Sequence, residues 1–150
     1  MAATRTATVT WTGPLATGSG TVSAGSSMLF TDLPVSWPSR TESPEGRTSP
    51  EELLAAAHAS CFAMALSGAL ARAGMPPDHM HVSASVTFDK VGEAWTVTTS
   101  QLDVVGTVPG MDADAFDAAA ADAKDNCPIS RAITGNVELS ISATLEDGHE

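Results

Sequence analysis

Apolar and polar positions follow different periods along the chain, and the period predicts the elements. From residue 49 to residue 74 almost every side chain is apolar or small, which is typical of a helix buried on all sides. Residues 5–11, 81–88 and 137–145 instead alternate between apolar and polar positions, which predicts half-buried strands, and 94–107 is predicted as a further long strand. Strands before and after a central helix, joined mostly by hairpins, indicate an α+β fold with antiparallel sheets.

The central helix has clear start and stop signals. Ser49 and Glu52 can cap each other's backbone amides at its beginning, and Pro50 suits the first helical position. Arg72 in the last turn and Gly74 just beyond it mark the end. A chain of 150 residues offers little to cover such a helix on every side, so we expect a second subunit to cover its far side.

Shorter elements complete one predicted domain over residues 1–150. Residues 21–23 and 27–30 are predicted as short strands, and 33–50, with four prolines, as a surface loop. A helix is expected over 112–124, and a short one begins at the Asn-Cys-Pro sequence and runs through Arg131. The residues from 146 on form a polar tail, and His79, His81 and His149 are expected at the surface.

The negative net charge of the protein limits the kinds of molecule that it can be expected to bind. A net charge of −11 with only seven Lys and Arg argues against nucleic acid and anionic membranes as partners. No apolar run free of polar groups is long enough to cross a bilayer, and the N-terminus lacks the pattern of a signal peptide. We therefore expect a soluble, cytoplasmic protein, in which the two cysteines do not form a permanent structural disulfide.

The two cysteines, Cys61 and Cys127, differ in their local surroundings. Cys127 precedes Pro128 at a predicted helix start, where free amides favour a thiolate, whereas Cys61 lies mid-helix, where burial raises the thiol pKa. Local physics therefore favours Cys127 as the more acidic thiol. Cys61 can be a nucleophile only if a cation reaches it, and Arg40 and Arg47 on the proline-rich loop are the obvious sources.

Glu51 is a candidate to orient such an arginine. Ten residues separate Glu51 from Cys61, about 15 Å along one helix, so the two cannot meet within one chain. They can meet if two copies of the helix run antiparallel about a two-fold axis near residue 56, where Ala55, Ala56 and Ala57 allow close approach. The alternative is that Glu51 only stabilises the helix N-terminus.

Two segments carry a resemblance to a known family. The stretch SPEELLAAAHASCFAMALS, followed by DNCPISRAITGNVEL, resembles the OsmC/Ohr family, and its OsmC branch in particular. The resemblance implies an intertwined α+β homodimer with long buried central helices that reduces organic hydroperoxides. It implies Cys61 as the peroxidatic cysteine and Cys127 as the resolving one, with Glu51 and Arg40 completing the site, and Arg47 as the alternative arginine.

The resemblance also implies a reaction cycle. Cys61 would become a sulfenic acid, close a disulfide with Cys127, and be regenerated by a dithiol reductant such as a dihydrolipoyl group or by a small thiol. No metal or organic cofactor is needed. Five apolar side chains are candidates for the substrate-binding mouth, although core packing is the competing role for each: Phe62, Met64, Met28, Phe30 and Trp37.

The sequence leaves other interpretations of His58 and of the cysteine pair open. His58 lies one turn before Cys61 and could join the two cysteines in a metal site, but no fourth ligand is evident. A core or interface histidine that donates to a backbone carbonyl is therefore favoured. The cysteine pair could also serve a thiol-disulfide oxidoreductase or a redox sensor without peroxide turnover. A third possibility is a stress-induced dimer whose cysteines merely pack.

Overall fold

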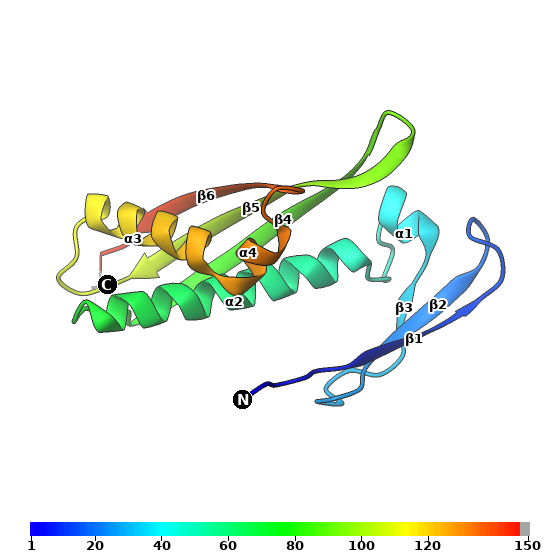
Figure 1. Ribbon diagram of the computed structural model, residues 1–150, viewed down its shortest axis with the longest axis horizontal. Coiled ribbons are helices and arrows are strands. Elements are labelled where there is room, and N and C mark those ends of the chain that lie inside the picture. Colours follow the sequence, from blue (N-terminus) through cyan, green and yellow to red (C-terminus); the bar gives the residue numbers. More distant parts are fainter. Residues whose placement is uncertain (148–150) are drawn as a thin grey trace. The chain divides into compact units, whose positions relative to one another are not determined.

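The computed structural model describes residues 1–147 and divides the chain into two units, one of residues 1–53 and one that begins at Leu54. The first unit contains the strands β1 to β3 and the short helix α1 (Figure 1). The second contains β4 to β6, α3, α4 and all but the first turn of the long helix α2. His149, which was expected at the surface, lies outside the described residues, as does the end of the polar tail.

The first unit is built on a three-stranded antiparallel sheet in the order β1-β2-β3. Its strands are β1 (Ala7–Thr12), β2 (Ser19–Ala24) and β3 (Leu33–Val35). Gly20 on β2 pairs with Trp11 on β1, and a Cβ at Gly20 would lie 2.7 Å from the Trp11 ring, so only glycine fits there. Every residue of β1 is exposed, so the expectation of a half-buried first strand is wrong for the isolated protomer.

The segment after β2 differs from the prediction in two ways: a predicted strand is absent, and a helix lies where a loop was predicted. The strand expected over 27–30 is absent, because Met28 and Asp32 adopt left-handed backbone conformations with φ of 57° and 55° that interrupt an extended chain. Within the expected loop lies α1 (Trp37–Thr41). Ser36 and Ser39 form its capping box: each serine side chain accepts from the other residue's backbone amide, at 3.2 Å and 3.1 Å.

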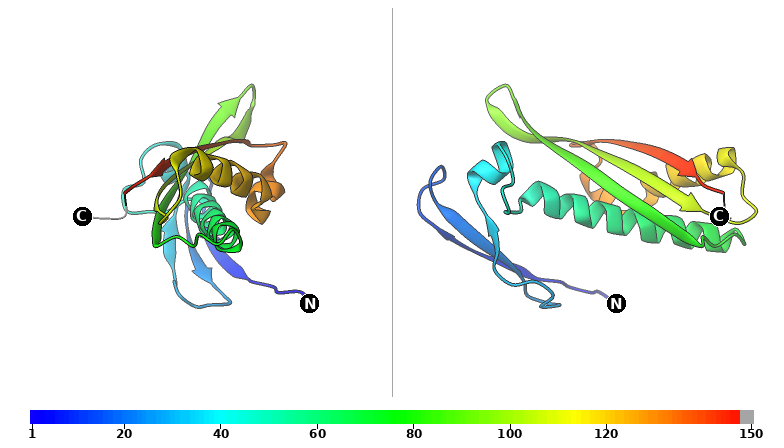
Figure 2. Two further views of the ribbon diagram at one scale, coloured as in Figure 1. Left: turned by 90° about the vertical axis from the view of Figure 1, so that its left-hand side faces the viewer. Right: turned by 180° about the vertical axis from the view of Figure 1, so that it is seen from behind.

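The second unit packs helices against a three-stranded sheet in the order β4-β5-β6 (Figure 2). The strands β4 (His79–Val91) and β5 (Ala94–Thr107) are antiparallel, as expected for a hairpin, but β6 (Glu138–Leu145) runs parallel to β5. The expectation of purely antiparallel sheets is therefore wrong here. The connection from β5 to β6 passes through two helices, and this crossover allows a parallel strand.

One face of this sheet carries the core. Leu102 and Val104 on β5 are buried together with Phe116 and Ala120 of α3 (Ala113–Asn126) and with Phe62 of α2 (Pro50–Arg72). The final helix, α4 (Pro128–Ile133), follows α3 after a single residue. The three helices therefore share one core with β5, and this core fixes where the two cysteine-bearing segments lie.

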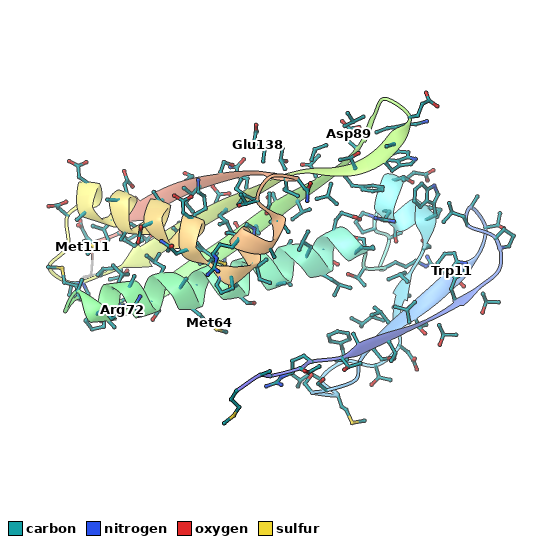
Figure 3. All side chains as sticks on the ribbon, viewed as in Figure 1. Trp11, Met64, Arg72, Asp89, Met111 and Glu138 are labelled. Atoms are coloured by element: carbon teal, nitrogen blue, oxygen red, sulfur yellow. The ribbon has the colours of Figure 1, made fainter. Side chains whose placement is uncertain are left out.

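The helix α2 is buried on one side only. Leu66 and Leu70 are almost completely buried, whereas Ala56, Ala57, Ser60 and Met64 are exposed. Met64 is 74% exposed and projects from α2 away from the sheet of the second unit (Figure 3). The expected burial of this helix on all sides is therefore incomplete within one protomer.

By length and composition α2 could cross a membrane, but it contains polar residues such as His58 and Ser60, so it does not contradict the expectation that no run free of polar groups is long enough. Its mean hydropathy reaches 1.7, and 22% of that stretch is buried. A core helix of a folded protein passes the same test, and α2 contributes Phe62, Leu66 and Leu70 to the core of the second unit. The surface positions expected for His79 and His81 on β4 are confirmed.

Candidate active site

The second unit brings the two cysteines together. Cys61 lies in the middle of α2 and is partly buried, and Cys127 is completely buried at the junction between α3 and α4. Cys127 has an extended backbone because the residue before a proline disfavours the helical region, so α3 ends there and α4 begins at Pro128. Both thiols are free, and their side chains are hydrogen-bonded to each other.

The surroundings of Cys61 oppose its ionisation. Burial raises the pKa of the Cys61 thiol, and its hydrogen bond to the Cys127 side chain raises it further, while a hydrogen bond from the Ile129 backbone lowers it. The expectation that burial raises this pKa is confirmed. Ile129 belongs to α4 and Cys127 directly precedes that helix, so one short stretch of chain supplies both the neighbouring thiol and the favourable backbone contact. Nucleophilic chemistry at Cys61 therefore calls for a further source of positive charge.

His58 is a core residue, but its partners differ from the expected one. Its Nδ1 lies 2.7 Å from Ser100 Oγ on β5 and its Nε2 lies 2.8 Å from Ser130 Oγ on α4, rather than on a backbone carbonyl. Burial lowers the pKa of His58, so the imidazole is neutral at physiological pH. Among the described residues, no group of three or more His, Cys, Asp or Glu side chains is placed to hold a metal ion.

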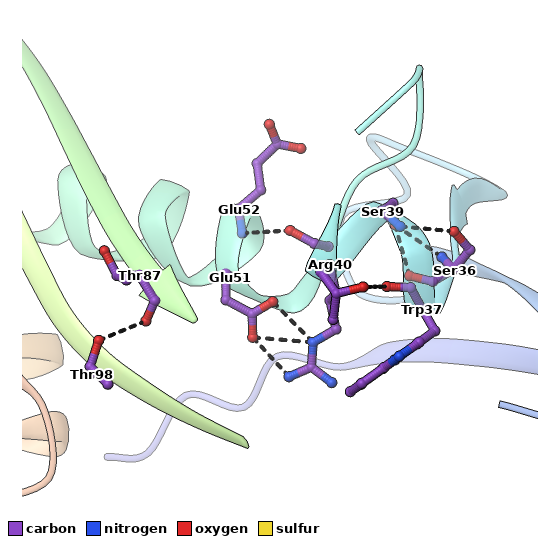
Figure 4. Close-up of polar contacts among 10 residues, drawn as sticks. Ser36, Trp37, Ser39, Arg40, Glu51, Glu52, Thr87 and Thr98 are labelled. Carbon is purple, nitrogen blue, oxygen red and sulfur yellow. Dashed lines mark hydrogen bonds and ion pairs between the residues drawn. The ribbon is translucent and has the colours of Figure 1, made fainter. Parts of the chain in front are cut away.

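The first unit holds the expected arginine and carboxylate together. Arg40 in α1 donates from Nε to Glu51 Oε1 at 3.0 Å and from Nη2 to Glu51 Oε2 at 2.8 Å (Figure 4). Glu51 is only 7% exposed, and the Arg40 guanidinium also lies 5.7 Å from the centre of the Trp37 ring. Of the two loop arginines, Arg40 pairs with Glu51, whereas Arg47 is exposed beside a polar recess.

An apolar recess of about 360 Å³ adjoins Arg40 within the first unit. Trp37 from α1 lines it, as do Trp11 and Leu15 from the β1–β2 hairpin, which the sequence did not suggest as site residues. The β1 alternation placed Trp11 on one face with Val9, but it could not show that α1 would lie beside that face. Both Trp11 and Leu15 keep substantial exposed surface, at 40% and 59%.

The five candidate substrate-binding residues lie in different places. Trp37 lines the recess beside Arg40, Phe30 is half-buried and Met28 is exposed, all three in the first unit. In the second unit, Met64 is exposed and Phe62 has no exposed surface. Complete burial favours the packing role for Phe62.

Each unit holds its own group of candidate site residues. The second unit contains a thiol pair in contact, and the first contains an oriented guanidinium beside an apolar recess. A thiol pair in contact can cycle between dithiol and disulfide, and an oriented guanidinium can stabilise an anion.

Comparison with known proteins decides the family. A family described as OsmC-like protein matches residues 43–142, which include Glu51 and both cysteines. The chain belongs to the OsmC family. It is similar to the protein named Peroxiredoxin OsmC of Escherichia coli (strain K12), with 40% identity over 129 residues that cover 86% of this chain and 89% of that protein.

Other proteins are also similar to this chain in sequence or in fold. The uncharacterised protein YmaD of Bacillus subtilis (strain 168) is 29% identical over 136 residues, which cover 87% of each chain. An organic hydroperoxide resistance protein from Elizabethkingia anophelis shares the fold with a TM-score of 0.71 at 22% identity, covering 97% of this chain and 100% of that one. The organic hydroperoxide resistance protein OhrB of Bacillus subtilis does so with a TM-score of 0.68 at 24% identity, over 94% and 98% of the two chains.

Proposed function

We propose that this member of the OsmC family is a cysteine-based thiol peroxidase that reduces organic hydroperoxides to alcohols. The observation that carries the proposal is the contact of the Cys61 thiol with Cys127 and with the Ile129 backbone. The name of the Escherichia coli relative, a peroxiredoxin, and those of the structural neighbours, organic hydroperoxide resistance proteins, support the same chemistry. The whole chain acts as one OsmC-like domain in this proposal.

The proposed reaction has two steps at sulfur. The Cys61 thiolate attacks the terminal oxygen of the hydroperoxide, the O–O bond breaks, and the leaving alkoxide takes a proton to become the alcohol. The Cys61 sulfenic acid is then attacked by the Cys127 thiolate, so that an S–S bond forms, the S–O bond breaks and water leaves. A dithiol, of the dihydrolipoyl type, or a small thiol reduces the disulfide through a mixed disulfide.

The positive charge comes from Arg40 in this proposal. Its guanidinium stabilises the Cys61 thiolate and orients the peroxide, and Glu51 holds the guanidinium in place through the two hydrogen bonds. In a dry site such a charge outweighs the effect of burial on the Cys61 thiol. Glu51 and Cys61 lie ten residues apart on α2, about 15 Å along the helix, so the site draws them from different chains.

We therefore propose an intertwined homodimer in which two copies of α2 run antiparallel about an axis near residue 56. The exposed small residues Ala56, Ala57 and Ser60 support close approach of two helices on this face. The exposure of every β1 residue supports a further contact with the partner. Each of the two sites then combines the cysteines of one chain with Arg40 and Glu51 of the other.

The apolar recess beside Arg40 supports an organic rather than an inorganic peroxide as substrate. Trp37 lies beside Arg40 in the recess. Phe30, Met28 and Met64, which keep exposed surface, stay candidates for the rest of the mouth in this proposal, and Phe62, which has none, is assigned to core packing. We place the protein in the cytoplasm, where thiols are kept reduced and the resting enzyme is a dithiol.

A peroxide-consumption assay tests the proposal. Cumene hydroperoxide with dihydrolipoamide as reductant should be consumed catalytically by the wild type and not by Cys61→Ser. Ser140→Ala, which changes an exposed serine on β6 away from the proposed helix–helix contact, is the control and should retain turnover. Disulfide cycling without peroxide consumption would support an oxidoreductase or redox sensor instead, and thiols inert to peroxide and iodoacetamide would leave only a packing role.

A further inference from the structure

A buried hydrogen-bond network connects α2, which carries Cys61, with α4, which begins directly after Cys127. His58 on α2, Ser100 on β5 and Ser130 on α4 all have no exposed surface, and His58 bonds both hydroxyls, at 2.7 Å and 2.8 Å. The partners lie 42 and 72 residues away along the chain. The proposed peroxidase reaction assigns no role to this network.

The network suits a neutral imidazole. A neutral ring has one N–H that donates and one nitrogen that accepts, and a serine hydroxyl can play either part. Both ring nitrogens are therefore satisfied without a charge, as complete burial requires. Because unsatisfied polar atoms are costly in the core, His58 defines the spacing of α2, β5 and α4 at this point.

The position of Ser130 connects the network to the groups that contact Cys61. Ser130 directly follows Ile129, whose backbone hydrogen-bonds Cys61, and comes three residues after Cys127. On the other side, His58 lies one helical turn before Cys61 on α2. The helix α4 has only six residues, so a displacement of Ser130 would move both groups that touch the Cys61 sulfur.

We propose that His58 is a positioning residue that holds α4 against α2, and so keeps Cys127 and the Ile129 amide in contact with Cys61. This inference rests on the proposed function, because it concerns the closure of the Cys61–Cys127 disulfide. Loss of the network leaves Cys61 in place but lets α4 move away, which slows closure and removes the Ile129 backbone contact, which favours the thiolate.

A hydrolytic role for the same residues is less consistent with the structure. A serine beside a histidine resembles part of a nucleophilic dyad, but Ser100 and Ser130 have no exposed surface for a substrate to reach. Both hydroxyls are also occupied by the one imidazole. The network is therefore structural in its contacts, and its effect on chemistry passes through α4.

A disulfide reagent measures closure without any peroxide. The aromatic disulfide dithiobis-nitrobenzoate reacts with Cys61, the more accessible thiol, and releases one thionitrobenzoate. Cys127 then attacks the Cys61 sulfur of the mixed disulfide, which forms the intrachain disulfide and releases a second thionitrobenzoate. The rate of the second release reports how well Cys127 is positioned.

The decisive variants are His58→Phe and Ser130→Ala, with His58→Gln as the conservative replacement, because a Gln amide keeps one donor and one acceptor. We expect a second release about tenfold slower in the first two, because each loses the bond between α2 and α4, and one lost hydrogen bond gives an effect of this size. His58→Gln should recover part of the rate. Leu66→Ala, which opens the core elsewhere on α2, is the control and should close at the wild-type rate.

The outcomes separate the two proposals. A wild type that releases only one thionitrobenzoate would overturn the proposed disulfide cycle itself. A wild type that releases two, with His58→Phe and Ser130→Ala closing equally fast, would overturn only the positioning role. The positioning role would also be overturned if Leu66→Ala slowed closure as much as His58→Phe and Ser130→Ala do. The rate of closure would then depend on the overall stability of the fold. If His58→Phe does not fold, Ser130→Ala and His58→Gln decide the question.

Discussion

Arg40 and Glu51 form a two-pronged ion pair, with Nε 3.0 Å from Oε1 and Nη2 2.8 Å from Oε2. The carboxylate is nearly buried, at 7% exposure, so the guanidinium is held in one plane before any substrate arrives. The two hydrogen bonds offset the cost of burying the carboxylate, and the Arg40 side chain keeps 28% of its surface exposed. In the proposed reaction the pair presents a fixed positive charge to the Cys61 sulfur and the peroxide.

Loss of the carboxylate charge should slow the peroxide reaction. Glu51→Gln removes a charge-assisted partner of Arg40, and we expect the second-order rate constant for cumene hydroperoxide to fall by about tenfold to hundredfold. Glu52→Gln is the matched control, because Glu52 is the exposed neighbour on the same turn and bonds Thr48 rather than Arg40. Stopped-flow measurement should show a near wild-type rate for Glu52→Gln, and equal losses in both variants would contradict the assignment.

The two loop arginines should differ in their effect. Arg40→Lys keeps the charge but loses the planar pair with Glu51, so we expect peroxide reduction to fall by about tenfold or more. Arg47→Lys alters an exposed side chain and should leave the rate nearly unchanged. Steady-state consumption of cumene hydroperoxide compares them directly. A larger loss in Arg47→Lys would transfer the catalytic role to Arg47.

Shared sites predict complementation between two inactive variants. Cys61→Ser and Arg40→Ala should each be inactive alone, because each removes an essential part of both sites. After subunit exchange, a mixed dimer has one site with Cys61 from one chain and Arg40 from the other, so about a quarter of all sites should be active. Peroxide consumption before and after exchange measures this. A mixture that stays inactive, although mass spectrometry shows mixed dimers, would rule out sites shared between chains.

Acid should weaken the fold through His58. Burial lowers the pKa of His58 below the ordinary value of 6.5, so the unfolded chain binds a proton there at a pH where the folded chain does not. The free energy of unfolding should therefore fall as the pH drops below about 6.5, and His58→Gln should flatten that fall. His81→Gln, at an exposed position, should keep it. Urea unfolding at several pH values gives the comparison, and parallel curves for wild type and His58→Gln would contradict it.

Much of the second unit could be predicted from the sequence because its signals are local. Alternation locates β4 and β6, and the caps at Ser49 and Arg72 locate α2 to within about two residues. The direction of β6 could not be predicted in this way, because periodicity does not determine which neighbour a strand pairs with. It depends on the path of α3 and α4 across the sheet.

The first unit and the histidine network were harder to predict for different reasons. The helix α1 begins with a capping box of two serines inside a proline-rich stretch, whose composition is typical of a loop. The partners of His58 lie on elements far along the chain, and no spacing rule connects them. The pairing of Arg40 with Glu51, by contrast, could be anticipated, because an arginine brought near Cys61 needs an anion to orient it and Glu51 was the candidate, and the family resemblance favoured Arg40 over Arg47.

Intact mass spectrometry after one equivalent of organic hydroperoxide tests the central claim most directly. The account predicts that the wild type loses about 2 Da, the two hydrogens given up when Cys61 and Cys127 form a disulfide. Cys127→Ser should instead gain the mass of one oxygen as a sulfenic acid at Cys61, and Cys61→Ser should not change. A wild-type mass that stays constant, or a loss that persists in either variant, would contradict the peroxidase cycle.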